Sequence, residues 1–170
     1  MSKRIILIGY MGAGKSTLGK SLAAQLGFPF IDSDFEIEKK FGKSISTIFA
    51  EKGEVGFREL ETQFIQNLSD STSFVLSTGG GLPCFNGNLL ILNSLGYTFY
   101  LKNESKVLAE RILNSTIERP IVKGKSFAEL VDFIEENLKE REAFYLKSNY
   151  TLTPKEQTVE YIIETLNLKK

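Results

Sequence analysis

The stretch GYMGAGKSTLG, residues 9–19, places four glycines, a lysine and two hydroxyl side chains directly after the apolar run RIILI. Gly9, Gly14, Lys15 and Ser16 fit the spacing G-x-x-x-x-G-K-[ST] between a strand and a helix, the context that a phosphate-binding loop needs. Glycines let backbone N–H groups curl around phosphate oxygens, and the helix N-terminus adds partial positive charge. In such a loop the lysine reaches the β- and γ-phosphates and the hydroxyl binds Mg²⁺. The predicted ATP contacts here are Gly12, Ala13, Gly14, Lys15, Ser16 and Thr17.

A glycine-rich turn without a ligand is the alternative, but the spacing arises by chance in only about one chain of this length in a few hundred. Nucleotide binding alone does not define an activity. The N-K-x-D and D-x-x-G motifs of a regulatory GTPase are absent from the sequence. The apolar run FVLST ends without the acidic residue of a motor-type ATPase. A carboxylate near the magnesium must therefore come from another segment.

Asp32 and Asp34 in the triplet DSD follow the apolar run FPFI. They are expected at the carboxyl end of a strand, where open α/β folds bind their ligands. Asp32 is predicted to hold Mg²⁺ through water, and Asp34 to receive the proton of an attacking hydroxyl. The alternative is helix capping, with Ser33 or Asp34 capping the following FEIEKKF.

Three consecutive glycines, Gly79, Gly80 and Gly81, follow the run FVLST. Ordering them is costly, because glycine loses more conformational freedom on folding than any other residue. Close approach of the backbone to a ligand would justify that cost. A tight turn without a ligand is the alternative.

The elements that must position these residues alternate along the chain. Short apolar runs, RIILIG, FPFID, FVLST, YTFYL and NYTLT, read as strands, and helical periodicity follows between them, as in KSTLGKSLAAQL before Gly27. This alternation predicts an α/β fold with a parallel sheet covered on both faces. Residues 113–126 lack periodicity and contain Pro120 and Gly124, which favours a mobile loop between two helices. We find no internal repeat or linker, so residues 1–170 are predicted to form a single domain.

The amino-acid composition excludes some classes of partner and of catalytic group. Lys plus Arg and Asp plus Glu both number 21, so no net positive charge favours nucleic acid or a membrane surface as partner. The single cysteine, Cys84, allows no internal disulfide and indicates a reducing compartment. Histidine is absent, which removes the commonest general base. The apolar run before Gly9 is too short for a signal peptide, so we expect a cytoplasmic protein.

In their order, these motifs resemble the shikimate kinase family. The resemblance covers nearly the whole chain. It rests on GYMGAGKST, DSD, FRELE at 57–61, TGGG at 78–81, ERP at 118–120 and EREAFY at 140–145. It implies transfer of phosphate from MgATP to the 3-hydroxyl of shikimate, on the route to chorismate and the aromatic amino acids. It also implies a P-loop kinase fold with a five-stranded parallel sheet in the order 2-3-1-4-5, and a monomer is expected.

The resemblance further implies roles for individual residues. Residues 33–62 correspond to the substrate-binding region and residues 113–126 to a closing lid. Lys15, Asp34 and Arg119 would be catalytic. Shikimate would be held by Asp34, Arg58, Gly79, Gly80, Gly81 and Arg141, with Glu61 bracing Arg58. The nucleotide would meet Arg111, Arg119, Thr153 and Pro154.

The residues support the same substrate class on chemical grounds. Shikimate carries a carboxylate and three hydroxyls, so its site needs guanidinium groups and an oxygen acceptor. In the helical stripe of SFAELVDFIEENLKEREAFY, Arg141 occupies a position where another apolar residue is expected. It either grips the carboxylate or extends its head into water from the end of the stripe. The rivals are a kinase of gluconate or of a nucleoside monophosphate, and an ATP-binding regulator without a small substrate.

Overall fold

The computed structural model describes residues 3–68, 72–115 and 122–167. Its strands are β1 (Arg4–Ile8), β2 (Phe30–Asp32), β3 (Phe74–Ser77), β4 (Tyr97–Leu101) and β5 (Tyr150–Leu152). Its α-helices are α1 (Lys15–Leu26), α2 (Ser33–Phe41), α3 (Ile45–Gln66), α4 (Asn88–Leu95), α5 (Ser105–Leu113), α6 (Phe127–Tyr145) and α7 (Val159–Thr165). Two short 3₁₀ helices, η1 (Leu82–Cys84) and η3 (Pro154–Glu156), complete the described elements.

The five strands form one parallel sheet in the order β2-β3-β1-β4-β5, which confirms the predicted order. Strand β1 lies at the centre, with Ile6 opposite Leu76 of β3 on one side and Thr98 of β4 on the other. All carboxyl ends therefore point the same way. The phosphate loop, the DSD triplet and the triple glycine follow β1, β2 and β3, so they meet at that edge.

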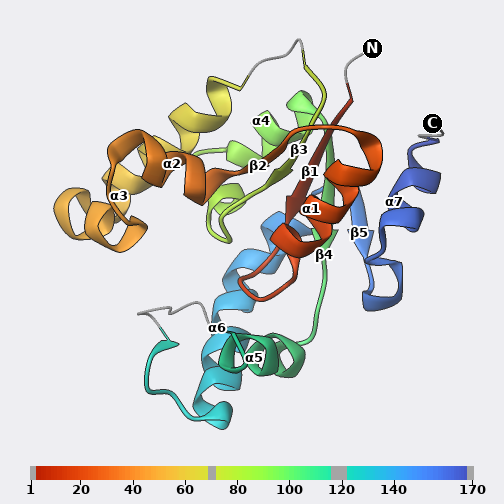
Figure 1. The fold of residues 1–170 in the computed structure, drawn as a ribbon. Coiled ribbons are helices and arrows are strands. Elements are labelled where there is room, and N and C mark those ends of the chain that lie inside the picture. The colour runs from red at the N-terminus through yellow and green to blue at the C-terminus, as the bar shows by residue number, and fades with distance from the viewer. Residues whose placement is uncertain (1–2, 69–71, 116–121, 168–170) are drawn as a thin grey trace.

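The side chains of β1 alternate between two hydrophobic cores. Ile5 and Leu7 belong to a core that includes residues of α1, α5, α6 and α7, whereas Ile6 and Ile8 belong to one with residues of α3 and α4. The sheet is therefore covered on both faces, as predicted. Figure 1 shows α4 and α1 on opposite sides of the central strands, with α5 and α6 lying together at the carboxyl end.

Local sequence explains most helix ends. Helix α1 ends at Gly27, which adopts φ 68° and caps the helix as predicted. Helix α2 is capped by Asp32, whose carboxylate accepts the backbone N–H groups of Asp34 and Phe35. The alternative in which Ser33 or Asp34 supplies this cap is wrong, because the helix begins at Ser33, two residues before FEIEKKF. Helix α3 is bent at Gly53, where φ is 68° and ψ is 179°.

The predicted lid, 113–126, connects α5 to α6. Its residues 116–121, including Arg119, lie outside the described residues.

Candidate active site

The phosphate loop has the backbone conformation that its glycines predict. Gly9, Gly12 and Gly14 have φ of 143°, 80° and 93°, values that side chains other than glycine rarely adopt. At Gly12 there is also little room, since a Cβ would lie 3.2 Å from the carbonyl oxygen of Leu108. The loop then leads into α1 with its backbone N–H groups unused by the helix.

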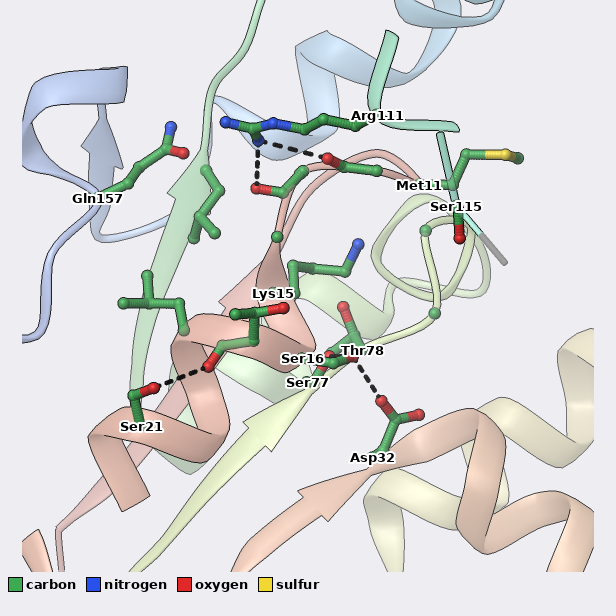
Figure 2. Close-up of a pocket in the computed structure, with 18 of the residues that line it drawn as sticks. Met11, Lys15, Ser16, Ser21, Asp32, Ser77, Thr78, Arg111, Ser115 and Gln157 are labelled. Carbon is green, nitrogen blue, oxygen red and sulfur yellow. Dashed lines mark hydrogen bonds between the residues drawn. The ribbon is translucent and has the colours of Figure 1, made fainter. Parts of the chain in front are cut away.

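Lys15 is 8% exposed, and its ammonium group donates to the carbonyl oxygens of Gly9 and Tyr10 at 2.8 and 2.9 Å. The lysine is thus held inside the curve of its own loop, where phosphates would lie. Arg111, in the last turn of α5, donates from Nη1 to the carbonyl oxygens of Gly12 and Ala13 at 3.4 and 3.2 Å (Figure 2). Lys15 and Arg111 therefore both place a positive charge against the backbone of the loop.

A pocket of about 830 Å³ lies over this loop. The predicted ATP contacts from Gly12 to Thr17, together with Arg111 and Pro154, line it. Thr153 is not among its lining residues; its side chain forms a capping box with Glu156. Sequence analysis missed Gln157, Thr158 and Val159, which line the pocket beyond β5. Their only signal was a position just after the carboxyl end of a strand.

Three oxygen-bearing side chains converge below the loop (Figure 2). The Ser16 hydroxyl donates to Oδ2 of Asp32 at 2.9 Å and lies 3.2 Å from the Ser77 hydroxyl. Asp32 uses Oδ1 for the cap of α2 and so presents Oδ2 to Ser16. Carboxylate and hydroxyl oxygens are the donors that Mg²⁺ prefers, and this ion usually keeps several waters. The residues present therefore fit a magnesium ion held by Ser16 and, through water, by Asp32. The described residues contain no cluster of three or more acidic, histidine or cysteine side chains that could hold a metal ion without the hydroxyl and water ligands.

Asp34 lines the same pocket, beyond the phosphate loop. Burial, helped by the neighbouring charge of Asp32, raises the pKa of Asp34 to about 6, although Lys15 opposes the shift. A carboxylate with such a pKa is largely ionised at neutral pH and is more basic than an ordinary aspartate. It suits the acceptance of a proton.

The triple glycine has a reason that the sequence did not reveal. A Cβ on Gly79 would lie 2.6 Å from Oδ1 of Asp34 and 3.2 Å from Oε1 of Glu61, and one on Gly81 would lie 2.5 Å from Nη1 of Arg58. None of the three glycines is among those with positive φ. Gly79 and Gly81 are therefore required as space for the protein's own charged side chains, rather than for an unusual backbone conformation, whereas a Cβ on Gly80 would meet nothing closer than 3.5 Å.

Arg58 is held from several directions. Its guanidinium pairs with the buried Glu61 at 2.8 Å and with Glu54 at 3.2 Å, and it stacks on the ring of Phe85 with 4.1 Å between Cζ and the ring centroid. Its Nε is buried without a hydrogen-bond partner. Burial raises the pKa of Glu61 to about 7, against the opposing charge of Arg58. The predicted bracing of Arg58 by Glu61 corresponds to this ion pair.

Arg141 comes from α6, on the other side of the triple glycine. Its guanidinium lies 5.7 Å from the centre of the Tyr10 ring. Burial raises the pKa of Cys84 to about 11, and Arg141 and Arg58 both oppose that shift. The charges of both arginines, one on α3 and one on α6, thus act on Cys84 in η1.

The model of the shikimate kinase family matches residues 11–167 of this chain. The chain belongs to the shikimate kinase family. A shikimate kinase of Bacteroides fragilis is 47% identical over 147 residues, which cover 86% of this chain and 82% of that relative. One from Azobacteroides pseudotrichonymphae is 44% identical over 165 residues, covering 96% and 97%.

Solved structures agree with this membership. A crystal structure of shikimate kinase from Bacteroides thetaiotaomicron superposes with a TM-score of 0.92 at 41% identity, covering 97% of this chain and 98% of that one. Shikimate kinase from Acinetobacter baumannii in complex with shikimate gives 0.87 at 32% identity, covering 99% and 96%. A gluconokinase from Sinorhizobium meliloti gives 0.57 at 17% identity, covering 98% and 96%, a likeness of fold alone.

Among the described residues, no helix combines the length and the apolar character needed to traverse a bilayer.

Proposed function

We propose that this chain transfers the γ-phosphoryl group of ATP to the 3-hydroxyl of shikimate, giving shikimate 3-phosphate and ADP. The observation that carries the proposal is the position of Asp34 in the pocket over the phosphate loop, where it would meet the hydroxyl. Arg58, paired with Glu61 against Gly81, and Arg141, beside Tyr10 of the loop, lie outside the lining of that pocket and would meet the carboxylate. A regulator that only binds ATP has no use for arginines held beside the triple glycine and the phosphate loop. Membership of the shikimate kinase family supports the same substrate.

The donor half of the reaction belongs to the loop and its neighbours. The N–H groups of the loop and of the first turn of α1 bind the phosphates, and Lys15 neutralises charge that develops on the transferred group. Arg111 is positioned to reach a phosphate or ribose oxygen from α5. Ser16 and, through water, Asp32 would hold magnesium, which would supply positive charge to offset that of the phosphates.

The acceptor half relies on Asp34. With a pKa of about 6, it accepts the proton of the attacking hydroxyl at neutral pH and orients that oxygen toward the phosphate. The two arginines hold the carboxylate of the substrate through charge-assisted hydrogen bonds. Gly79, Gly80 and Gly81 keep the space between these groups open.

Three further assignments belong to this proposal. Arg119 stabilises the transferred phosphoryl group when residues 113–126 close as a lid. Pro154 contacts the adenine from the segment after β5, and Thr153 flanks it there. The protein acts as a cytoplasmic monomer.

The test is an assay of ADP release coupled to NADH oxidation, with shikimate, gluconate and nucleoside monophosphates offered in turn. We expect turnover with shikimate at a specificity constant at least about a hundredfold above the others, because a site built to pair a ligand's polar groups strongly rejects analogues that leave them unpaired. Preferred turnover of gluconate would instead assign the arginines to another hydroxy acid. ATP binding without any turnover would favour the regulator.

A further inference from the structure

Tyr145, the last residue of α6, is fully buried and lies beside the acceptor site. Its hydroxyl donates a hydrogen bond to the carbonyl oxygen of Gly80 over 2.5 Å. Tyr145 belongs to the EREAFY motif, but neither the motif nor the resemblance assigns a role to it.

The ring of Tyr100 holds the Tyr145 ring in place. The ring lies against that of Tyr100 on β4, with 5.0 Å between centroids, and both tyrosines belong to the core on the α3 and α4 side of the sheet. Tyr100 is anchored in the central sheet by the pairing of β4 with β1. The position of the Tyr145 hydroxyl is therefore set by the sheet rather than by a loop.

Gly80, which accepts this hydrogen bond, lies close to the backbone of the phosphate loop. A Cβ on Gly80 would be 3.5 Å from the backbone nitrogen of Met11 and 3.6 Å from the carbonyl oxygen of Gly9. Gly80 thus passes directly beside the phosphate loop. A bond to its carbonyl ties α6 to the place where the donor and acceptor halves of the site meet.

The helix that carries the Tyr145 hydroxyl also carries Arg141, which is proposed to bind the carboxylate of the substrate. Arg141 lies four residues before Tyr145, so the two side chains project from the same face of α6. Burial raises the pKa of Tyr145 well above its ordinary value, and the charge of Arg141 opposes that shift only in part. The hydroxyl therefore stays protonated at all working pH values and remains a donor to Gly80.

We propose that Tyr145 is a positioning residue for the phosphate acceptor: by holding the carbonyl of Gly80, it fixes Arg141 and the triple glycine at one distance from the phosphate loop. This proposal rests on the proposed function, since it concerns where the acceptor lies relative to ATP. Tyr145 itself contacts neither substrate.

Tyr145→Phe tests the proposal, because it removes one oxygen and keeps the packed ring. Tyr100→Phe is the matched control: Tyr100 is equally buried, but its hydroxyl bonds to Glu142 at 3.2 Å, away from the triple glycine. For Tyr145→Phe we expect the KM for shikimate to rise about tenfold, equivalent to about 1.4 kcal/mol. The KM for ATP should change less than about twofold, since small misplacement of the acceptor leaves the nucleotide contacts intact.

A second measurement is the rise in melting temperature that shikimate causes in each variant relative to its own ligand-free state. It should shrink in Tyr145→Phe and stay at the wild-type value in Tyr100→Phe. Equal kinetic effects of the two substitutions, an unchanged shikimate KM in Tyr145→Phe, or failure of Tyr145→Phe alone to fold would each overturn the proposal and leave Tyr145 a purely structural residue. Absence of shikimate turnover in the wild-type chain would instead overturn the proposed function.

Discussion

Asp34 must be ionised to accept a proton, yet it lies where ionisation is costly. Its pKa of about 6 exceeds the ordinary value of 3.8, so the unfolded chain releases this proton at lower pH than the folded one. The stabilising contribution is therefore fully present below about pH 4 and is lost as pH rises through about 6. At neutral pH the folded protein tolerates a charge that it would be more stable without.

We therefore expect Asp34→Asn to lower kcat by about 10²- to 10⁴-fold while leaving ATP binding nearly unchanged, because an amide cannot take the proton. The same variant should be more stable than wild type at pH 8, by up to about 3 kcal/mol, and should show no gain at pH 4. Chemical denaturation at the two pH values measures this. Glu36→Gln, in the first turn of the same helix, controls for removing a carboxylate there. A loss of activity under about threefold would tell against Asp34 as the base.

The same pKa predicts the acid limb of the rate profile. For the free enzyme, kcat/KM for shikimate should fall tenfold per pH unit below about 6, since only ionised Asp34 accepts the proton. Steady-state rates between pH 5 and 8 measure the limb. A rate that stays level down to pH 5 would contradict the burial argument.

Lys15 offers a test of the donor side. We expect Lys15→Ala to abolish turnover and to retain the folded structure, because its loss removes a charge partner of the transferred phosphoryl group, worth several kcal/mol in such sites. The assay is ADP release alongside thermal melting. A folded variant with near-normal activity would remove the phosphate-loop assignment.

At the scale of elements, the triple glycine contains a glycine that lies against a side chain of the protein and one that does not. Gly81→Ala would place a Cβ 2.5 Å from Nη1 of Arg58, whereas Gly80→Ala would meet nothing closer than 3.5 Å. Because the clash falls on the end of a side chain rather than on backbone, the fold should survive and Arg58 should move. We expect Gly81→Ala to raise the shikimate KM by about tenfold or more with little change in melting temperature. Gly80→Ala is the matched substitution, and a larger rise there would show that the substrate, rather than Arg58, needs the space.

Sequence patterns anticipated the strands and most helices because their signals are local: a five-residue apolar run, a glycine after a helix. They did not anticipate the residues that act through distant contacts. Nothing near Gly81 in the sequence indicates that Arg58 will lie against it, and nothing near Tyr145 indicates Gly80. Strand order likewise came from family resemblance, since an apolar run such as FVLS carries no information about which strand it will pair with.

At the scale of the whole molecule, the segment between α5 and α6 is predicted to close over bound nucleotide. Lys123 and Lys125 provide tryptic sites in this segment. We expect MgATP to slow cleavage at them, because Arg119 gains a phosphate partner and the segment orders around it. Mass spectrometry of timed digests locates the cuts, and cuts elsewhere in the chain serve as the internal control. Equal cleavage rates with and without MgATP would contradict the lid.

The position of β1 has a consequence for how the protein is made. It is the first strand to leave the ribosome, yet it pairs with Phe74–Ser77 on one side and Tyr97–Leu101 on the other. Its apolar run therefore stays unpaired until Phe74–Ser77 has been made, and its other side stays open until Tyr97–Leu101 follows, past the middle of the chain. Such late strand pairing slows folding and exposes an aggregation-prone apolar segment to other nascent chains. Chaperone demand during synthesis should accordingly fall on the segment that later carries the phosphate loop, and it should end once β4 has emerged.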